Sequence, residues 1–448
     1  MTHHTTTDFS VKHCGVYRNL PVLGSATNDL TAIVPGATGI SGWNTIRSLL
    51  ESPDRWTKIY AMSRSPPKQE LLDLLPAEQQ LRVHHLPVDF SGSAADVASS
   101  LKQVRGERLY VFFYAYLQPK TEEHEGVWQN VEKLKETNEK LFSTFLEALE
   151  LADLKPRRIL LQTGGKNYGM QIGRAPAPWV ESDPQPRHLD PNFYYGQEDA
   201  LHAYCQRHPE TSWNVTRPAG VMGSALNAQM NFLYLCAVYA AVQANKQQPI
   251  YFPGDWNSWQ APLPLSTARL TGFQSEWAVL KDECKDQAFN CEDMNNLTHQ
   301  RLLAELARWY GAKGVEPPPT DENQYQQVKG RGGDECPLGH GPPTEIRFTM
   351  KMADWARDVQ TQQAWQRIME HSNGKVTINP FEESVLKDNF EFLHICLTVT
   401  GTMSMNKARL LGWTGFVDTL EAAFESCQEM ARMGLLPPVV VDAPRPMV

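Results

Sequence analysis

A short apolar run near the start of the chain is followed at once by a glycine-rich turn. Thr31-Ala32-Ile33-Val34 predicts a buried strand, and Trp43 to Leu50 predicts a helix. Between them, the first glycine permits a tight turn, the second lets backbone approach a pyrophosphate, and the third allows close helix–strand packing. The helix N-terminus then offers N–H groups to phosphate. This pattern predicts a dinucleotide site that uses Gly36, Thr38, Gly39, Ile40 and Gly42.

The end of the next strand indicates which dinucleotide is bound. Lys58 to Met62 predicts a second strand, which runs into Ser63 and Arg64. An acidic residue here would bind the ribose 2′-hydroxyl of NAD, whereas a hydroxyl and a guanidinium suit the 2′-phosphate of NADP. Asp89 follows a third strand and is expected to flank the adenine, with a turn or helix-cap aspartate as the alternative. We therefore expect NADP(H) as the cofactor. The alternative for Arg64 is an ordinary solvated arginine on the surface.

The chain from residue 28 to residue 225 alternates apolar runs with amphipathic stretches, which predicts an α/β Rossmann fold with a doubly wound parallel sheet. We expect residues 1–27 to be an N-terminal arm, with a loose polar start at Met1 to Thr7, and residues 28–225 to be the NADP-binding domain. We expect residues 226–448 to form a mostly helical lobe that caps the substrate. Within that lobe, 285–292 is expected to return to the sheet and 313–344 to be an exposed excursion.

Composition excludes several classes of function. The chain has 448 residues and a formal net charge of −9, which argues against binding nucleic acid or anionic membranes. No apolar stretch reaches the length of a bilayer span. The eight cysteines show no paired spacing, so we expect reduced thiols, no metal site and a cytoplasmic location. A homodimer is also an expectation.

The catalytic residues do not follow the usual pattern of short-chain dehydrogenases, in which a Tyr-x-x-x-Lys turn supplies a proton source beside the nicotinamide. A predicted fifth strand, Arg158 to Thr163, instead runs into a segment that contains Lys166 and Tyr168. After a proline-rich loop comes Asn192-Phe193-Tyr194-Tyr195-Gly196-Gln197-Glu198-Asp199. The residue four positions after Tyr194 is therefore a glutamate and not a lysine.

These two motifs, Gln162-Thr163-Gly164-Gly165-Lys166-Asn167-Tyr168 and Asn192 to Asp199, make the chain resemble the progesterone 5β-reductase/iridoid synthase family of atypical extended short-chain dehydrogenases. The resemblance covers nearly the whole chain. It implies that Lys166 and Tyr194 form the catalytic pair, while Thr163 lies in the cofactor site. It also implies an NADPH-dependent reduction of the activated C=C bond of an apolar enone or enal, in specialised metabolism. Tyr168 and Tyr195 are interpreted as structural or pocket-lining.

Departures from the family pattern bear on the substrate. Tyr114-Ala115-Tyr116-Leu117 replaces a pair that commonly carries a tryptophan, and Gly401 stands where an aromatic residue is frequent. We expect the pocket to be capped by Asn231–Gln247 and Asn389–Phe416, with Gly401 leaving room for a large substrate. Three alternatives stay open: a ketoreductase, a biosynthetic cyclase that uses the same pocket, and a non-catalytic NADP-binding regulator.

Overall fold

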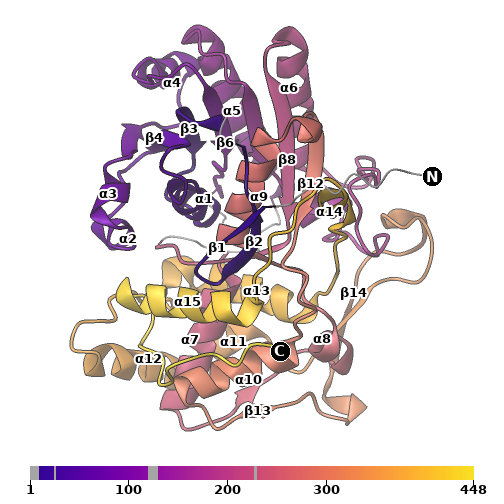
Figure 1. The fold of residues 1–448 in the computed structure, drawn as a ribbon. Coiled ribbons are helices and arrows are strands. Elements are labelled where there is room, and N and C mark those ends of the chain that lie inside the picture. Colours follow the sequence, from indigo (N-terminus) through magenta and orange to yellow (C-terminus); the bar gives the residue numbers. More distant parts are fainter. Residues whose placement is uncertain (1–9, 25–26, 120–129, 227–229, 448) are drawn as a thin grey trace, which may run out of the picture.

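The structure, a computed structural model, describes residues 10–24, 27–119, 130–226 and 230–447, and it is built on a parallel sheet of seven strands (Figure 1). The first strand of this sheet along the chain is β3. The chain then moves outward to β4 and β5 and returns to β6 on the other side of β3, so the sheet is doubly wound. This confirms the predicted α/β Rossmann fold. Across the sheet the strands are β12 (Gln287–Cys291), β8 (Ser212–Pro218), β7 (Arg158–Gln162), β6 (Leu109–Phe113), β3 (Leu30–Pro35), β4 (Trp56–Ser63) and β5 (Val83–Pro87).

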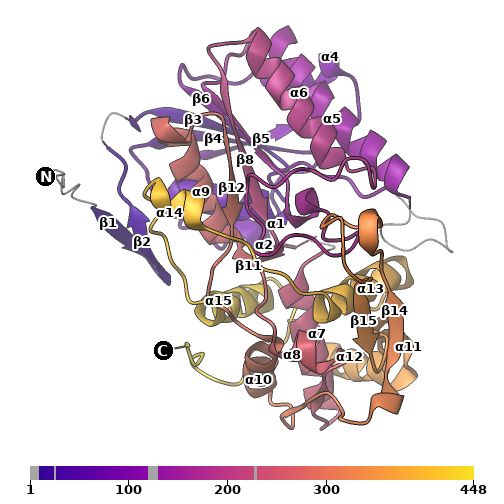
Figure 2. The same ribbon diagram turned by 90° about the vertical axis from the view of Figure 1, so that its right-hand side faces the viewer.

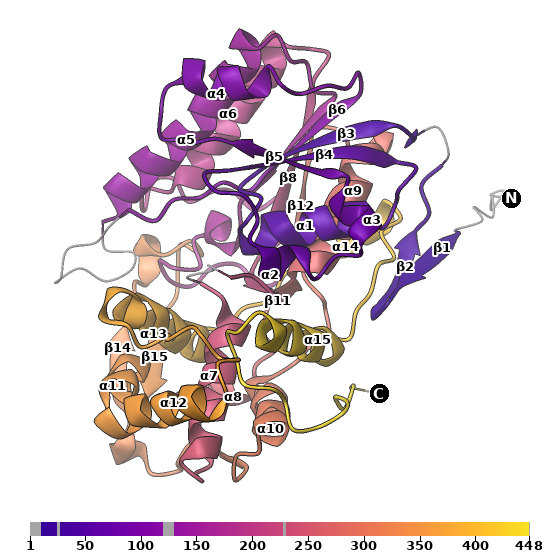
Figure 3. The same cartoon turned by 90° about the vertical axis from the view of Figure 1, so that its left-hand side faces the viewer.

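Helices cover both faces of the sheet because its strands are apolar on both faces. Along β3, Ile33 points into one hydrophobic core, while Ala32 and Val34 point into the other. One face is covered by α4, α5 and α6, and the other by α1 and α9 (Figure 3). The sequence 268–291 therefore belongs to the sheet layer. These helices are α1 (Ile40–Leu50), α4 (Ala94–Leu101), α5 (Val131–Leu151), α6 (Phe193–Arg207) and α9 (Ala268–Leu280).

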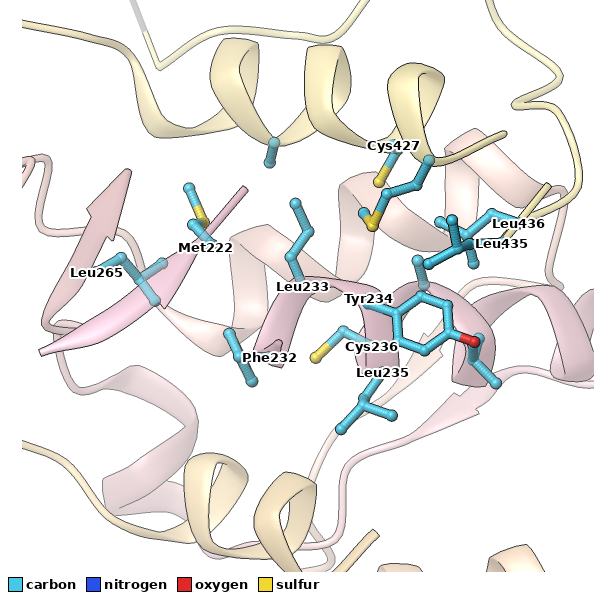
Figure 4. Packing of buried hydrophobic residues seen from close by; sticks show 14 of the residues in the cluster. Met222, Phe232, Leu233, Tyr234, Leu235, Cys236, Leu265, Cys427, Leu435 and Leu436 are labelled. Atoms are coloured by element: carbon cyan, nitrogen blue, oxygen red, sulfur yellow. The ribbon is translucent and has the colours of Figure 1, made fainter. Parts of the chain in front are cut away.

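A second, helical lobe lies below the sheet and surrounds α7 (Phe232–Asn245) (Figures 1 and 2). Every residue of α7 from Phe232 to Gln243 is buried, as expected for a helix that is apolar all round. Figure 4 shows its first turns packed against Cys427 and Leu435 from the C-terminal part of the chain. We expected this segment to cover the pocket, but it is the central core helix of the lobe. Around it lie α10 (His299–Tyr310), α11 (Met352–Arg357), α12 (Val359–His371), α13 (Glu383–Thr398) and α15 (Thr419–Arg432).

A buried ion pair joins helix α1, which packs on the sheet, to helix α15 of the helical lobe. Arg47 of α1 donates to both carboxylate oxygens of Glu429 of α15, at 2.9 and 2.5 Å, and the two side chains are only 6 and 5 % exposed. Arg47 also donates to Ser224 Oγ, at 3.2 Å. The helix that follows the glycine-rich turn is thus fixed directly to the C-terminal helix.

The N-terminal segment is a hairpin and not an arm. The expected loose segment Met1–Thr7 lies outside the described residues, but β1 (Val11–Cys14) and β2 (Tyr17–Pro21) pair antiparallel. The burial of Tyr17 and Leu20 in one cluster with Trp277 and Trp413 explains why this hairpin packs against the protein.

Short elements complete the described chain. The pair β14 (Gln326–Lys329) and β15 (Glu345–Phe348) forms an antiparallel ribbon, and all four residues of β14 are exposed. No helix in the described ranges is both long and apolar enough to cross a membrane. The remaining elements are α2 (Gln69–Leu72), α3 (Ala77–Gln80), η2 (Gly165–Tyr168), β9 (Gly220–Met222), β10 (Ile250–Tyr251), α8 (Trp256–Gln260), β11 (Leu265–Thr267), η3 (Asp282–Cys284), β13 (Val315–Glu316), η4 (Glu322–Gln324), η5 (Gly333–Glu335) and α14 (Asn406–Leu410).

Candidate active site

The glycine-rich turn connects β3 to α1 at the carboxyl edge of the sheet, and two of its glycines, Gly36 and Gly42, are required sterically. Gly36 has φ +81°, and a Cβ there would lie 2.6 Å from the backbone carbon of Tyr114. A Cβ on Gly42 would overlap the carbonyl oxygen of Gly36. At Gly39 a Cβ would meet only Gly36 O, at 3.4 Å, so this position is open on its outer side. The turn therefore has the compact shape that lets a phosphate approach backbone.

The start of α1 fits a pyrophosphate. No described side chain caps its N-terminus, so the N–H groups of the first turn, which includes Ile40, stay available as donors. Gln162 at the end of β7 donates to Ser41 Oγ, at 2.8 Å, and this bond joins the turn to the strand that leads to Lys166. Thr163 Oγ1 is buried without a hydrogen-bond partner at the same edge. Three features together fit a dinucleotide: the compact glycine-rich turn, the uncapped start of α1, and the buried hydroxyl of Thr163, for which no described residue is a hydrogen-bond partner. Thr38 is in the same turn.

The residues expected to bind the cofactor's adenosine end are close together. Ser63 is buried and donates through Oγ to Ser65 O, at 2.7 Å, while Arg64 is exposed. The hydroxyl and N–H of Ser91, helped by the positive charge of Arg64, hold the pKa of Asp89 below its ordinary value. Arg64 and Asp89 follow the ends of the adjacent parallel strands β4 and β5.

Lys166 and Tyr194 meet at the same edge of the sheet. Lys166 lies in the single turn η2 directly after β7, and Tyr194 is the second residue of α6. A Cβ on Gly164 would lie 3.2 Å from the phenol oxygen of Tyr194, so the hydroxyl rests against the chain two residues before Lys166. The Asn192 side chain contacts both segments: Nδ2 donates to Lys166 O at 2.9 Å, and Oδ1 accepts from Tyr194 N at 3.0 Å.

Burial controls the charges of this pair. Desolvation lowers the pKa of Lys166 to about 7, and it raises the pKa of Tyr194 above its ordinary value. Tyr194 is therefore a neutral phenol at physiological pH, able to donate a hydrogen bond. Desolvation therefore makes this phenol hold its proton more firmly than an exposed tyrosine does.

The glutamate that replaces the usual lysine has a structural role. Glu198 pairs with Arg217 of β8 at 3.2 Å, and both side chains are about nine-tenths buried. Gln185 Nε2 also donates to Glu198, at 2.9 Å. The turn position that normally carries a lysine thus faces a buried arginine.

Tyr168 and Tyr195 have hydrogen-bonded hydroxyls, as their structural interpretation requires. The hydroxyl of Tyr168 donates to Asn290 Oδ1 at 2.5 Å, and that of Tyr195 donates to Asn167 O at 3.3 Å. The ring of Tyr168 also stacks on Trp179, with centroids 5.9 Å apart and an interplanar angle of 15°.

Trp179 occupies the space that we expected beside Gly401. A Cβ on Gly401 would overlap the indole and lie 2.5 Å from its Cζ2 atom. The proline-rich loop is held there because Trp179 N donates to Thr402 O and Ser404 N donates to Trp179 O, both at 2.9 Å. The expectation of extra room at Gly401 is therefore wrong: an indole from a segment distant in sequence fills it.

Helix α13 carries Cys396, whose thiol is close enough to Lys166 for the charge of the lysine to oppose the larger effect of burial, which raises the pKa of the thiol. Aromatic rings pack beside Tyr194: Tyr116 packs on Phe193, with ring centroids 5.9 Å apart, and Phe193 packs on Tyr194 at 4.5 Å. That Asn389–Phe416 caps the pocket stays a prediction. Within the described ranges, no three His, Cys, Asp or Glu side chains are grouped to hold a metal ion.

Sequence reasoning missed Asn192, Trp179, and the Glu198–Arg217 pair. Each acts through a contact between distant segments, and only Asn192 carried a local signal, since an asparagine before an aromatic helical run is a typical N-cap. The amide of Asn192 has both a donor and an acceptor and stands next to Tyr194 in the sequence, and these two facts could have indicated a bridging role.

Comparison with known proteins supports the fold and shows the family. A family sequence model described as a PRISE-like Rossmann-fold domain matches residues 32–332. The short chain dehydrogenase gsfE of Penicillium aethiopicum is 27 % identical over 91 % of this chain and 99 % of its own. The 3-oxo-Δ4,5-steroid 5β-reductase of Arabidopsis thaliana is 24 % identical, over 88 and 89 % of the two chains. The (S)-8-oxocitronellyl enol synthase of Catharanthus roseus is 24 % identical, over 90 % of each.

Proposed function

This chain belongs to the PRISE-like Rossmann-fold family, and from that premise we propose that it is an NADPH-dependent reductase of the activated C=C bond of an apolar enone or enal. It is an oxidoreductase of the short-chain dehydrogenase/reductase superfamily. Two relatives over most of the chain are named a steroid 5β-reductase and an oxocitronellyl enol synthase, and these names support enone chemistry in specialised metabolism.

The cofactor is a nicotinamide dinucleotide, and we propose NADP(H). The Gly36–Gly42 turn and the start of α1 would hold its pyrophosphate, while Ser63 and Arg64 would bind the 2′-phosphate. When bound there, the nicotinamide supplies a hydride for the β-carbon of the substrate. Arg64 is exposed and lies at the end of β4, where a phosphate can reach it without being desolvated.

Tyr194 and Lys166 stabilise the charge that develops on the substrate. As the β-carbon accepts a hydride, the carbonyl oxygen gains negative charge, and the neutral phenol of Tyr194 donates a hydrogen bond to it. Lys166, when protonated, adds positive charge beside the same oxygen. Desolvation lowers the pKa of Lys166, so its surroundings are less polar than bulk water, and this strengthens both interactions.

The observation that carries the proposal is the position of the Tyr194 phenol against Gly164, close to Lys166 and on the edge of the sheet where the glycine-rich turn lies. The test follows NADPH oxidation with a panel of enones, enals and ketones. Tyr194→Phe should reduce kcat by roughly 10²–10⁴-fold with little change in NADPH affinity, because the phenol matters only as charge develops.

A matched control lies on the same helix. Tyr204 is buried, and its ring packs on His208 at the far end of α6, so Tyr204→Phe should leave kcat unchanged. Normal turnover by Tyr194→Phe on the weakest acceptor that reacts would remove Tyr194 from the mechanism. Reduction of ketones alone, with enone double bonds left intact, would replace this proposal by a ketoreductase.

A further inference from the structure

We propose that Asn192 is a positioning residue that clamps together the two backbone segments that carry Lys166 and Tyr194; this inference rests on the proposed function for the roles of those two residues. One amide group contacts the backbone of both. Its Nδ2 donates to Lys166 O at 2.9 Å, while its Oδ1 accepts from Tyr194 N at 3.0 Å. The residue is only 6 % exposed, so water competes little for either bond.

The clamp matters because the catalytic residues belong to separate segments. Lys166 is in a single 3-10 turn, and the chain from Gly169 to Pro191 crosses a region without helix or strand before α6 begins. A single turn has little stability of its own. Lys166 O also accepts from Gly169 N, at 3.1 Å, but that bond lies within the turn and does not fix it to α6.

A second bond attaches the same turn to the same helix start. The hydroxyl of Tyr195 donates to Asn167 O, the carbonyl next to that of Lys166, at 3.3 Å. Tyr195 N in turn donates to the backbone oxygen of Asn192, at 3.1 Å. Two consecutive carbonyls of the turn are therefore held by the residues that begin α6, which leaves the turn little freedom to move away from Tyr194.

A role as a helix cap alone would not require this arrangement. Asn192 is the N-cap of α6, and its Oδ1 is sufficient for that role. Aspartate and serine cap helices about as well as asparagine. An ionised aspartate has no donor, and serine has one oxygen in place of the two separate atoms of the amide, so the bond from Nδ2 to Lys166 O separates a clamp from a cap.

Two variants use this difference. Asn192→Asp and Asn192→Ser both keep an acceptor for Tyr194 N, but the carboxylate cannot donate to Lys166 O, and serine has no second atom at the position of Nδ2. The matched control is Asn130→Asp, because Asn130 caps α5 by accepting from Lys133 N at 3.2 Å, away from Lys166. Helix capping is preserved in all three. The unfolding midpoint should stay close to that of the unaltered protein in Asn192→Ser and Asn130→Asp, whereas Asn192→Asp also buries a carboxylate and should unfold at a lower midpoint.

Activity is the first readout, measured with an enone that the unaltered enzyme reduces. Both Asn192 variants should lose roughly 10- to 100-fold in kcat, since a displacement of about 1 Å between catalytic groups costs on that order. The KM for the enone and the affinity for NADPH should change less than about twofold, because binding does not depend on the clamp. Asn130→Asp should match the unaltered enzyme.

Hydrogen exchange followed by mass spectrometry is the second readout, and it needs no substrate. Peptides that contain Gly165 to Gly169 should exchange at least about fivefold faster in both Asn192 variants, with α6 unchanged, because the turn opens independently once it is released. Unchanged exchange would overturn the clamp whether or not any enone is reduced. Faster exchange without turnover by the unaltered enzyme would retain the clamp and refute the proposed function. Faster exchange with unchanged kcat would show that the clamp does not position the catalytic pair.

Discussion

A methyl group added at Gly401 should destabilise the protein through a single contact. The new Cβ would overlap the Trp179 indole and lie 2.5 Å from its Cζ2 atom, whereas an ordinary carbon contact is at least about 3.4 Å. The indole has little room to retreat, because it stacks on Tyr168 and lies 3.5 Å from the position of a Cβ on Gly165. Overpacking of this kind costs about 1–3 kcal/mol, so Gly401→Ala should lower the free energy of unfolding by that amount.

Denaturant unfolding measures this effect against a matched control. Gly24 has nothing within 4 Å of its Cβ position, so Gly24→Ala should change the free energy of unfolding by less than about 0.5 kcal/mol. Trp179→Leu removes the obstructing ring, and the double variant Gly401→Ala/Trp179→Leu should show a favourable coupling of about 1 kcal/mol or more. Equal effects of the two glycine substitutions, or additive effects of Gly401→Ala and Trp179→Leu, would refute the conclusion that Trp179 fills this space.

Three further predictions concern charge. Arg64→Ala should weaken NADPH binding by about 1.5–3 kcal/mol and NADH binding much less, as measured by fluorescence titration; an unchanged preference would contradict the 2′-phosphate contact. Because the pKa of Lys166 is lowered to about 7, kcat should fall as the pH rises through that value, and Lys166→Arg should move the fall to higher pH, since a guanidinium stays protonated; a limb that does not move belongs to another group. Glu429→Ala leaves Arg47 buried without its carboxylate and should cost about 3–5 kcal/mol of unfolding free energy, against at most about 1 kcal/mol for the exposed pair partner in Asp199→Ala; similar losses would contradict the burial argument.

The sheet could be predicted from the sequence because its signals are local. Buried parallel strands are short apolar runs, and the glycine-rich turn after β3 has steric requirements that three glycines satisfy within a few residues. The order of the strands then follows from the rules for crossover connections. The burial of α7 could be predicted only in part, since an apolar helix can be a core helix or a pocket wall, and its neighbours decide which.

The walls of the site could not be predicted because they depend on distant contacts. Gly401 is small for a reason that lies in Trp179, far away in the chain, and a sequence pattern shows the small residue without its partner. In the same way, Glu198 marked the loss of a familiar lysine, but its pairing with Arg217 appears only when α6 packs on β8. Motifs suggested the reacting groups, and tertiary packing decides how the residues that carry them are held.

The fate of the transferred hydride tests the proposed reaction most directly. The enzyme would be given an accepted enone and NADPH that carries deuterium at both C4 positions of the nicotinamide, and the product would be analysed by NMR. If Tyr194 and Lys166 stabilise charge on the carbonyl oxygen during reduction of the C=C bond, deuterium will be found on the β-carbon and the carbonyl will remain. Deuterium on the former carbonyl carbon, in an alcohol that retains its double bond, would contradict the account.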